Sequence, residues 1–345
     1  MMRPCAAALA LVLCALSAQF AAAHGITIKV QHVLPADSPL HTAFLIPWTE
    51  KVAKESGGRL HFQLLPGTQG TESQLFDRAK SGEVEMIWAS TDVTPARFTS
   101  FEVFALPFMT NSTQGSSRAL WEYVRMSDLA QTEFDEMRVL AVHQSDAPQF
   151  HLHGRGIQTI SDLRGIKLGV PSPMGAKLLT ALGAGAIEMP SAQIAGALAK
   201  GDIDGALLPW EAASTLKLDA LLKHHSEADP AHARLYAPVY VLAMNAGAYK
   251  GLPDDLKKVI QANSGAETSA WLAKVFDDAA ADARKRAVER GETVNVIARE
   301  ELGRWKDSVQ TMIDAWIKQV DQRGEPGKKL IDAAREAIAE YDTRR

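Results

Sequence analysis

The sequence has 345 residues, of which 46% are hydrophobic and 23% charged, and its formal net charge is −4 at pH 7. These values are typical of a soluble globular protein that is large enough to build its own core. The mild acidity offers no concentrated basic face, so we expect no nucleic-acid partner. The two cysteines, Cys5 and Cys14, lie near the N-terminus, and disulfide bonds are not expected to stabilise the remainder.

The first 23 residues have the pattern of a cleavable secretory signal. Arg3 is followed by an apolar run from Ala6 to Leu16, and small residues precede His24. The run is shorter than the roughly 20 apolar residues that a membrane-spanning helix needs. We therefore predict a signal peptide at 1–23, cleavage after Ala23 and export to the periplasm.

The segment that follows predicts a strand, helix, strand, helix, strand unit. Its elements in chain order are a strand at 26–33, a helix that contains Phe44, Trp48 and Val52, a strand at 60–64, a helix from Thr71 to Ser81 and a strand at 84–89. Apolar residues alternate in the strands and recur every three or four positions in the helices. Pro47 is expected to kink the first helix, and Thr71 with Gln74 predicts a capping box for the second.

The same order of elements recurs further along the chain. The second unit consists of a strand at 166–170, a helix at 176–182, a strand at 186–189, a helix that Ser191 caps and that runs to Lys200, and a strand at 203–208. The closing segments of the two units align without a gap. Two aligned positions are identical, Gln74 with Gln193 and Gly82 with Gly201. Repeated strand–helix units favour parallel sheets that bind ligands beyond the carboxyl ends of their strands. Two such units facing each other predict a cleft.

Two further strand-like segments are candidates for the connections between the units. One covers 139–153, between the two units, and the other covers 235–245, after the second unit. From Pro253 onward the pattern is helical, including a long stretch at 267–290, with one short strand at 294–297. A helix of that length is long enough to brace two lobes.

Four segments carry a resemblance to a known family: FEVFALPF at 101–108, DLRGIKLGVPSPMGAKLLTALGA at 162–184, MPSAQIAGALAKGDIDGALLPWE at 189–211 and MNAGAYKGLPDDLKKVI at 244–260. With these segments in this order, the chain resembles the substrate-binding proteins of tripartite ATP-independent periplasmic (TRAP) transporters, the DctP-like family. The resemblance implies a receptor rather than an enzyme, with no cofactor and no metal. It also implies that the receptor captures a small organic acid and delivers it to TRAP permease membrane subunits.

The resemblance implies an α/β periplasmic-binding-protein clamshell with discontinuous domains and a long C-terminal helix that braces both lobes. We assign residues 24–148 with about 238–275 to lobe I, and residues 149–237 with about 276–345 to lobe II.

The residues that usually hold the ligand carboxylate in this family are replaced. An arginine in a KIRV-like sequence is the usual anchor because it forms a bidentate pair with a carboxylate. This chain has Gly169 at that position, and a second family arginine and an asparagine align with Gln149 and Leu208. The sequence therefore indicates either a carboxylate that is held differently or an organic acid that is not typical of the family.

The candidate ligand-binding residues lie near the predicted carboxyl ends of the strands: His32, Gln69, Ser90, Thr91, Gln149, His151, Gly169, Pro171, Ser172, Met174, Trp210, Glu211 and Tyr240. Trp210 is either a core residue or a platform for the ligand. In the second case Trp210, Met174, Tyr240 and Trp88 would form an aromatic, adaptable pocket, with Gly169 leaving space where the arginine normally projects.

The histidines admit two interpretations. His32, His151 and His153 are either hydrogen-bonded groups near the hinge or donors that replace the missing arginine. The pair His224–His225 lies in a polar segment that we predict to be solvated surface.

Two other functions share a two-lobed cleft. A periplasmic enzyme is disfavoured because the chain has no GxSxG or HExxH motif and no cysteine nucleophile. A solute receptor for an ABC transporter or a sensor kinase would have the same architecture, and the family resemblance alone separates it from a TRAP receptor.

Overall fold

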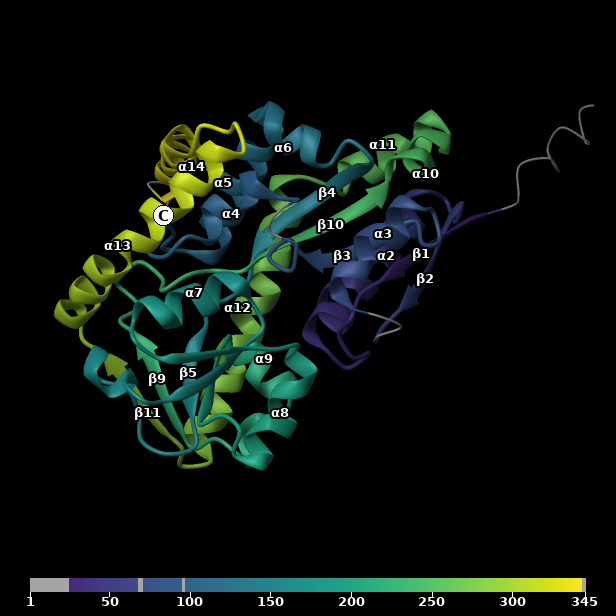
Figure 1. Cartoon of the computed structure of the whole chain (residues 1–345). Helices are drawn as coiled ribbons and strands as arrows, with labels where there is room; N and C mark the ends of the chain where they lie inside the picture. Colours follow the sequence, from purple (N-terminus) through teal and green to yellow (C-terminus); the bar gives the residue numbers. More distant parts are fainter. Residues whose placement is uncertain (1–24, 68–70, 95–96, 343–345) are drawn as a thin grey trace, which may run out of the picture.

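The computed structural model describes residues 25–67, 71–94 and 97–342, and Figure 1 shows how they form two lobes. Within these residues, one lobe contains a five-stranded sheet and the other a six-stranded sheet, and helices pack against both. The predicted two-lobed α/β fold is therefore confirmed. The predicted signal peptide lies outside the described residues. None of the described helices combines the length and apolar character that a membrane span requires.

The sheet of lobe I combines parallel and antiparallel strands. Its spatial order is β2 (Leu60–Leu65), β1 (Ile26–Gln31), β3 (Met86–Ser90), β10 (Val239–Asn245) and β4 (Met137–Gln144). The strands of the first predicted unit pair in parallel, whereas β10 runs antiparallel to β3 and β4. Its helical segments are η1 (Leu40–Leu45), α2 (Ile46–Glu55), α3 (Glu72–Lys80), α4 (Thr99–Ala105), α5 (Thr113–Met126) and α6 (Asp128–Glu133). A strand that arrives from the other lobe thus lies inside the sheet.

The helix starts in lobe I follow the local sequence. The first predicted helix consists of the π-helical segment η1 followed directly by α2, and Pro47 lies in the first turn of α2. Pro47 has no N–H to donate to the preceding turn, and it lies where the hydrogen bonding changes from π-helical to α-helical instead of inside a regular α-helix. The capping box of α3 is present as predicted, with the Thr71 N–H donating to Gln74 Oε1 at 2.8 Å.

The sheet of lobe II has the spatial order β11 (Thr293–Ile297), β9 (His224–Ala228), β5 (Gln149–Leu152), β8 (Gly205–Leu208), β6 (Lys167–Val170) and β7 (Gly185–Glu188). The strands of the second unit are parallel, and β5 runs antiparallel to β8 and β9. The segments η2 (Ile160–Leu163), α7 (Pro173–Ala181), α8 (Ser191–Lys200), α9 (Trp210–Thr215) and η3 (Leu218–Ala220) complete this part of the lobe.

Two local predictions in lobe II are wrong. Ser191 does not cap α8, because the helix begins at Ser191 itself and Pro190 occupies the capping position. The segment with His224 and His225 is not a solvated loop but strand β9, which pairs with β5 and β11. The prediction failed because a polar sequence was taken to mean exposure. The His225 side chain is buried, and His151 and Glu292 are its hydrogen-bond partners.

Several segments join the lobes. The chain passes from β4 to β5 through residues 145–148 and returns between β9 and β10. Helix α12 (Ala266–Glu289) packs against α5, β4 and η1 of lobe I and against α9 and β11 of lobe II (Figure 1). The remaining helices are α10 (Ala246–Gly251), α11 (Asp254–Ala262), α13 (Arg299–Gln322) and α14 (Gly327–Asp342). The predicted long bracing helix is present, and we retain the lobe boundaries as a proposal.

Strand β8 requires a glycine at its first residue. A Cβ at Gly205 would collide with the backbone oxygen of His151 on the neighbouring strand β5. We expect Gly205→Ala to lower the free energy of unfolding by about 1–3 kcal/mol, because the backbone cannot move without breaking the β5–β8 pairing. Urea denaturation followed by circular dichroism measures the change.

Gly196 supplies the matched control. It is exposed on α8, and a Cβ there meets nothing within 4 Å. Gly196→Ala should raise the free energy of unfolding by up to about 1 kcal/mol, because alanine is the better helix former. Equal stability of the Gly205→Ala variant and the unmodified protein would contradict the packing described for β8.

Candidate ligand-binding cleft between the lobes

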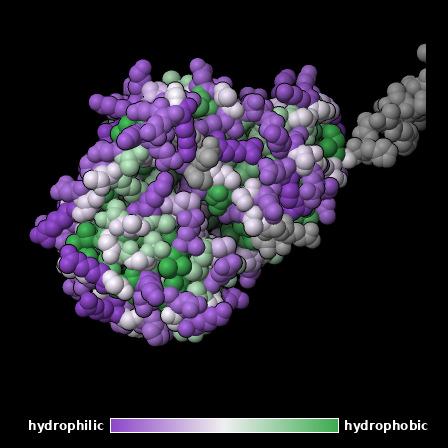
Figure 2. Space-filling view, in the orientation of Figure 1, coloured by the Kyte–Doolittle hydropathy of each residue, from purple (hydrophilic) through white to green (hydrophobic). Residues whose placement is uncertain are grey.

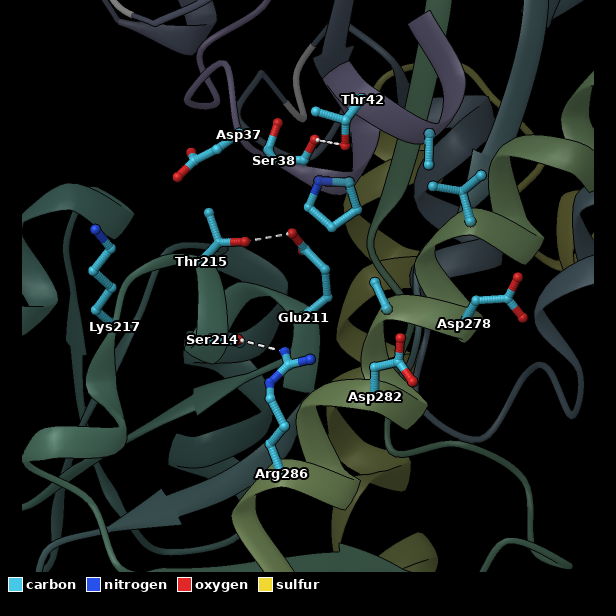
Figure 3. Close-up of a pocket in the computed structure, with 14 residues that line it drawn as sticks. Asp37, Ser38, Thr42, Glu211, Ser214, Thr215, Lys217, Asp278, Asp282 and Arg286 are labelled. Atoms are coloured by element: carbon cyan, nitrogen blue, oxygen red, sulfur yellow. Dashed lines mark hydrogen bonds between the residues drawn. The ribbon is translucent and has the colours of Figure 1, made fainter. Parts of the chain in front are cut away.

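An open pocket of about 420 Å³ lies between the lobes, and Figure 3 shows its lining. Lobe I contributes the loop after β1, lobe II contributes α9 and the turn that follows it, and α12 lies along one side. The polar and charged residues that line it are Asp37, Ser38, Thr42, Glu211, Ser214, Thr215, Lys217, Asp278, Asp282 and Arg286. In the space-filling view a hollow is visible where the two lobes meet (Figure 2).

Glu211, a predicted site residue, lies on the lobe II wall of this pocket. The Thr215 hydroxyl donates to its Oε1 at 2.7 Å, and burial raises the pKa of the carboxyl group. Next to it, the Arg286 guanidinium donates to the Ser214 hydroxyl at 3.1 Å and so ties α12 to α9. Glu211 also acts electrostatically on Tyr240, which connects this pocket to the inner part of the cleft.

A stack of aromatic rings lies in lobe I, where β10 enters the sheet from the connection between the lobes. Tyr240 on β10 stacks on Trp88 of β3 with ring centroids 4.5 Å apart and an interplanar angle of 6°. His143 of β4 and Phe276 of α12 stack against the same rings. The Trp88 indole N–H donates to His143 Nε2 at 2.9 Å, and burial lowers the pKa of His143 to about 3. A neutral His143 therefore holds Trp88, and Trp88 supports Tyr240.

The lobe II side is built around Tyr236, on the segment that returns to lobe I. Its hydroxyl shares a hydrogen bond with the side chain of Ser172, which caps α7 by accepting from the Gly175 N–H at 3.3 Å. A Cβ at Gly175 would lie 2.7 Å from the Tyr236 hydroxyl oxygen, so only glycine allows this approach. Asp92 of lobe I acts electrostatically on the same tyrosine. The predicted ends of β3 and β6 therefore do face each other across Tyr236.

Buried carboxyl groups surround these tyrosines. Burial raises the pKa of Glu72, raises that of Asp92 to about 8, and raises that of Asp146 well above its ordinary value. The Asp146 carboxylate accepts a hydrogen bond from the Trp210 backbone N–H at 2.9 Å, at the start of α9. One oxygen of Asp92 and one of Asp146 have no hydrogen-bond partner among the described residues. The inner cleft is thus rich in carboxyl groups that burial favours in the neutral form.

His151 and Trp210 form a separate cluster within lobe II. His151 Nδ1 lies 2.8 Å from His225 Nδ1, and its Nε2 lies 2.9 Å from the Leu208 carbonyl oxygen. Burial lowers the pKa of His151 to about 3. The Trp210 ring contacts both histidines and donates through Nε1 to Glu227 at 2.7 Å. Both ring nitrogens of His151 are therefore engaged inside the lobe, and Trp210 has the surroundings of a core residue.

Three other predicted residues also have internal partners. His32 is buried and pairs with His41 through Nε2 at 2.9 Å. The Gln149 amide is bonded to the backbone of Ala147 and Ala228. A Cβ at Gly169 would lie 2.7 Å from Ile203 Cδ1, so the expected free space at this position is wrong because an isoleucine fills it.

The remaining predicted residues lie at strand and helix ends. The Ser90 and Thr91 hydroxyls both donate to the Val239 carbonyl, Pro171 is partly buried after β6, and Met174 packs into the main core. Gln69 lies outside the described residues. Asp92 was considered with Ser90 and Thr91 at the end of the predicted strand but was not chosen as a ligand-binding residue, and Asp146 and Tyr236 were not considered. The available signal was position, because Asp92 directly follows β3 and the other two lie on the connections between the lobes.

Comparisons with known proteins agree with this architecture. The family model of the bacterial extracellular solute-binding protein, family 7, matches residues 30–319. A TRAP solute-binding protein from Rhodoferax ferrireducens, solved with copurified benzoate, is 39% identical with a TM-score of 0.88, covering 92% of this chain and 99% of that one. A marine metagenome TRAP solute-binding protein described as specific for aromatic acid ligands, solved with 3-hydroxybenzoate, is 33% identical with a TM-score of 0.88, covering 93% and 100%.

A curated relative, the outer membrane transporter protein TsaT of Comamonas testosteroni, is 26% identical over 322 residues, which are 91% of this chain and 92% of the relative. The family and these solved neighbours are solute-binding receptors, not enzymes. The matches extend across both lobes, so the chain belongs to the bacterial extracellular solute-binding proteins of family 7, the DctP family.

Proposed function

We propose that this chain binds an aromatic carboxylate, of the size of benzoate or a hydroxybenzoate, between its two lobes. The observation that carries the proposal is the flat ring stack that ends in Tyr240 at the cleft, in a chain 39% identical to a receptor solved with benzoate. An aromatic ligand can stack on Tyr240 or meet its edge, and such ring pairs contribute about 0.5–1.5 kcal/mol beyond area burial.

The site proposed here differs from the one predicted from sequence. We place Tyr240, Ser172 and Glu211 in the cleft and assign His151 and Trp210 to the core of lobe II. Ligand sites are mostly apolar and orient the ligand with a few polar groups. We propose that the hydroxyl groups of Tyr236 and Tyr240 have this role.

The cellular context follows from the same proposal. We infer that the receptor works in the periplasm after cleavage behind Ala23, performs no chemistry on its ligand and passes it to the TRAP permease membrane subunits. The family is described as extracellular solute-binding proteins, and this supports a location outside the cytoplasm.

Benzoate and 3-hydroxybenzoate should raise the melting temperature of the purified mature protein, because a ligand at 100 times its Kd stabilises the folded state by about 2.7 kcal/mol. Succinate and pyruvate serve as dicarboxylate and 2-oxo acid controls in the same thermal-shift measurement. Stabilisation by succinate alone would contradict the aromatic assignment.

Two aromatic variants test which ring contacts the ligand. Tyr240→Ala should weaken benzoate binding about three- to tenfold, measured by isothermal titration calorimetry, because it removes a ring contact. Trp210→Phe should leave the Kd unchanged but lower the free energy of unfolding by about 1–3 kcal/mol, because Glu227 loses a buried donor. Weaker benzoate binding by Trp210→Phe together with an unchanged Kd for Tyr240→Ala would instead place Trp210 in the ligand site.

Export can be checked on the full chain expressed in a Gram-negative host. Intact-mass measurement of the periplasmic fraction should show a protein that begins at His24. A product retained at the membrane with an intact N-terminus would instead indicate an anchor.

A further inference from the structure

Asp92 occupies an unusual position at the end of β3. It is 6% exposed and follows Ser90, which pairs with Tyr240 across β3 and β10. Its carboxyl group acts electrostatically on Tyr236 and Tyr240. One carboxyl oxygen accepts a hydrogen bond from the Val239 backbone N–H, and Oδ2 has no partner among the described residues. A buried polar atom without a partner carries a desolvation penalty of about 1–3 kcal/mol, which a ligand group could remove.

The charged groups around Asp92 are of its own sign. Glu102 from α4 and Glu72 from α3 are its strongest charged neighbours, and both disfavour a further negative charge. Two cations, Lys177 of α7 and Arg323 after α13, act on Glu102. Arg97 lies over the rings of Phe76 and Phe98 and pairs with Asp77 of α3. From β10 and the segment before it, the groups that face Asp92 are the neutral hydroxyls of Tyr236 and Tyr240.

A negatively charged ligand cannot be stabilised by an ionised carboxylate in these surroundings. A neutral carboxylic acid, in contrast, donates an O–H that can form a short charge-assisted hydrogen bond to a carboxylate. Asp146 repeats the pattern on the connection between the lobes, because its Oδ1 is also buried without a described partner and Glu211 and Asp277 are near it. Arg234 acts on Asp146 in the opposite sense, which makes Asp92 the clearer candidate for the neutral form.

We propose that Asp92 binds the ligand as a neutral carboxylic acid, donating its Oδ2–H to the carboxylate of the aromatic acid. The complex then holds the anion with one proton on Asp92. This assignment rests on the proposed function. It also gives a reason for the replacement of the family arginine by Gly169, because a proton on Asp92 supplies the donor that the guanidinium supplies elsewhere.

The pH dependence follows from the state of Asp92 before binding. Burial and the neighbouring carboxylates raise its pKa to about 8. Below that pH the proton is already present, and the Kd should not change. Above that pH Asp92 is ionised before binding, and it must take up a proton from solvent when the anion binds. No bond in the ligand is broken. The Kd should therefore rise toward about tenfold per pH unit.

Isothermal titration calorimetry of benzoate between pH 6.5 and 9.5, in buffers of different ionisation enthalpy, measures both quantities on the mature protein. We expect uptake of one proton per benzoate at pH 9.5 and none at pH 6.5. Asp92→Asn keeps a donor and an acceptor of the same shape, so it should bind at pH 7 with a similar Kd and lose the pH dependence. Asp92→Ala should weaken binding about 10- to 100-fold, because the donor is lost.

Glu133→Gln is the matched control. Glu133 is a half-buried carboxyl of the same lobe whose pKa is raised to about 7 by desolvation, and it accepts a hydrogen bond from the Ser100 N–H. This variant should retain the pH dependence of binding. Circular dichroism melting curves of each variant verify folding, and the Asn variant keeps the test valid if the Ala variant unfolds.

Two results would overturn the assignment. Benzoate binding with a pH-independent Kd, or an Asp92→Asn variant that retains the alkaline loss of affinity, contradicts the role of Asp92 and leaves the aromatic ligand in place. Absence of binding by any aromatic acid at any pH overturns the proposed function and the Asp92 assignment together.

Discussion

The free-energy cost of removing water from carboxyl groups is the constraint on which the cleft of this protein depends. An ionised carboxylate in a poorly solvated site needs a cation or several hydrogen-bond donors, and without them the neutral form is favoured. Burial raises the pKa of Glu72, Asp92, Asp146 and Glu211, of which Glu211 lines the pocket between the lobes and Asp146 lies on a connection between them. A receptor for anions can tolerate this arrangement because a protonated acid is a hydrogen-bond donor.

The two walls of the cleft have different physical characters. On the lobe I side, the flat rings of Trp88, His143 and Phe276 support Tyr240 from behind, and a neutral histidine acts as a hydrogen-bond acceptor within that stack. On the lobe II side, the approach of Tyr236 to the first turn of α7 depends on the absence of a side chain at Gly175. Apolar packing thus shapes one wall, and hydroxyl groups and a helix terminus shape the other.

The sequence predicted the fold well because its signals were local. The capping box at Thr71, the end of α8 at Gly201 and the long helix near 267–290 each depend on residues close together in the chain. The family followed from ordered motifs. The site was predicted less well because its partners are distant in sequence. From sequence, His151 was a candidate hydrogen-bond donor to the ligand, but in the fold β9 places His225 beside it. Gly169 was expected to leave free space, but the Ile203 side chain occupies it.

The position of β10 inside the lobe I sheet also has a consequence for the order in which the chain can fold during synthesis. The strand lies between β3 and β4, so the sheet cannot close until residues 239–245 are available, long after the first strand has emerged. Contacts between residues so far apart in sequence form slowly, because a long loop must close first. Lobe I therefore stays incomplete until most of the chain has been synthesised, and lobe II can complete its own sheet only after β11 at residues 293–297.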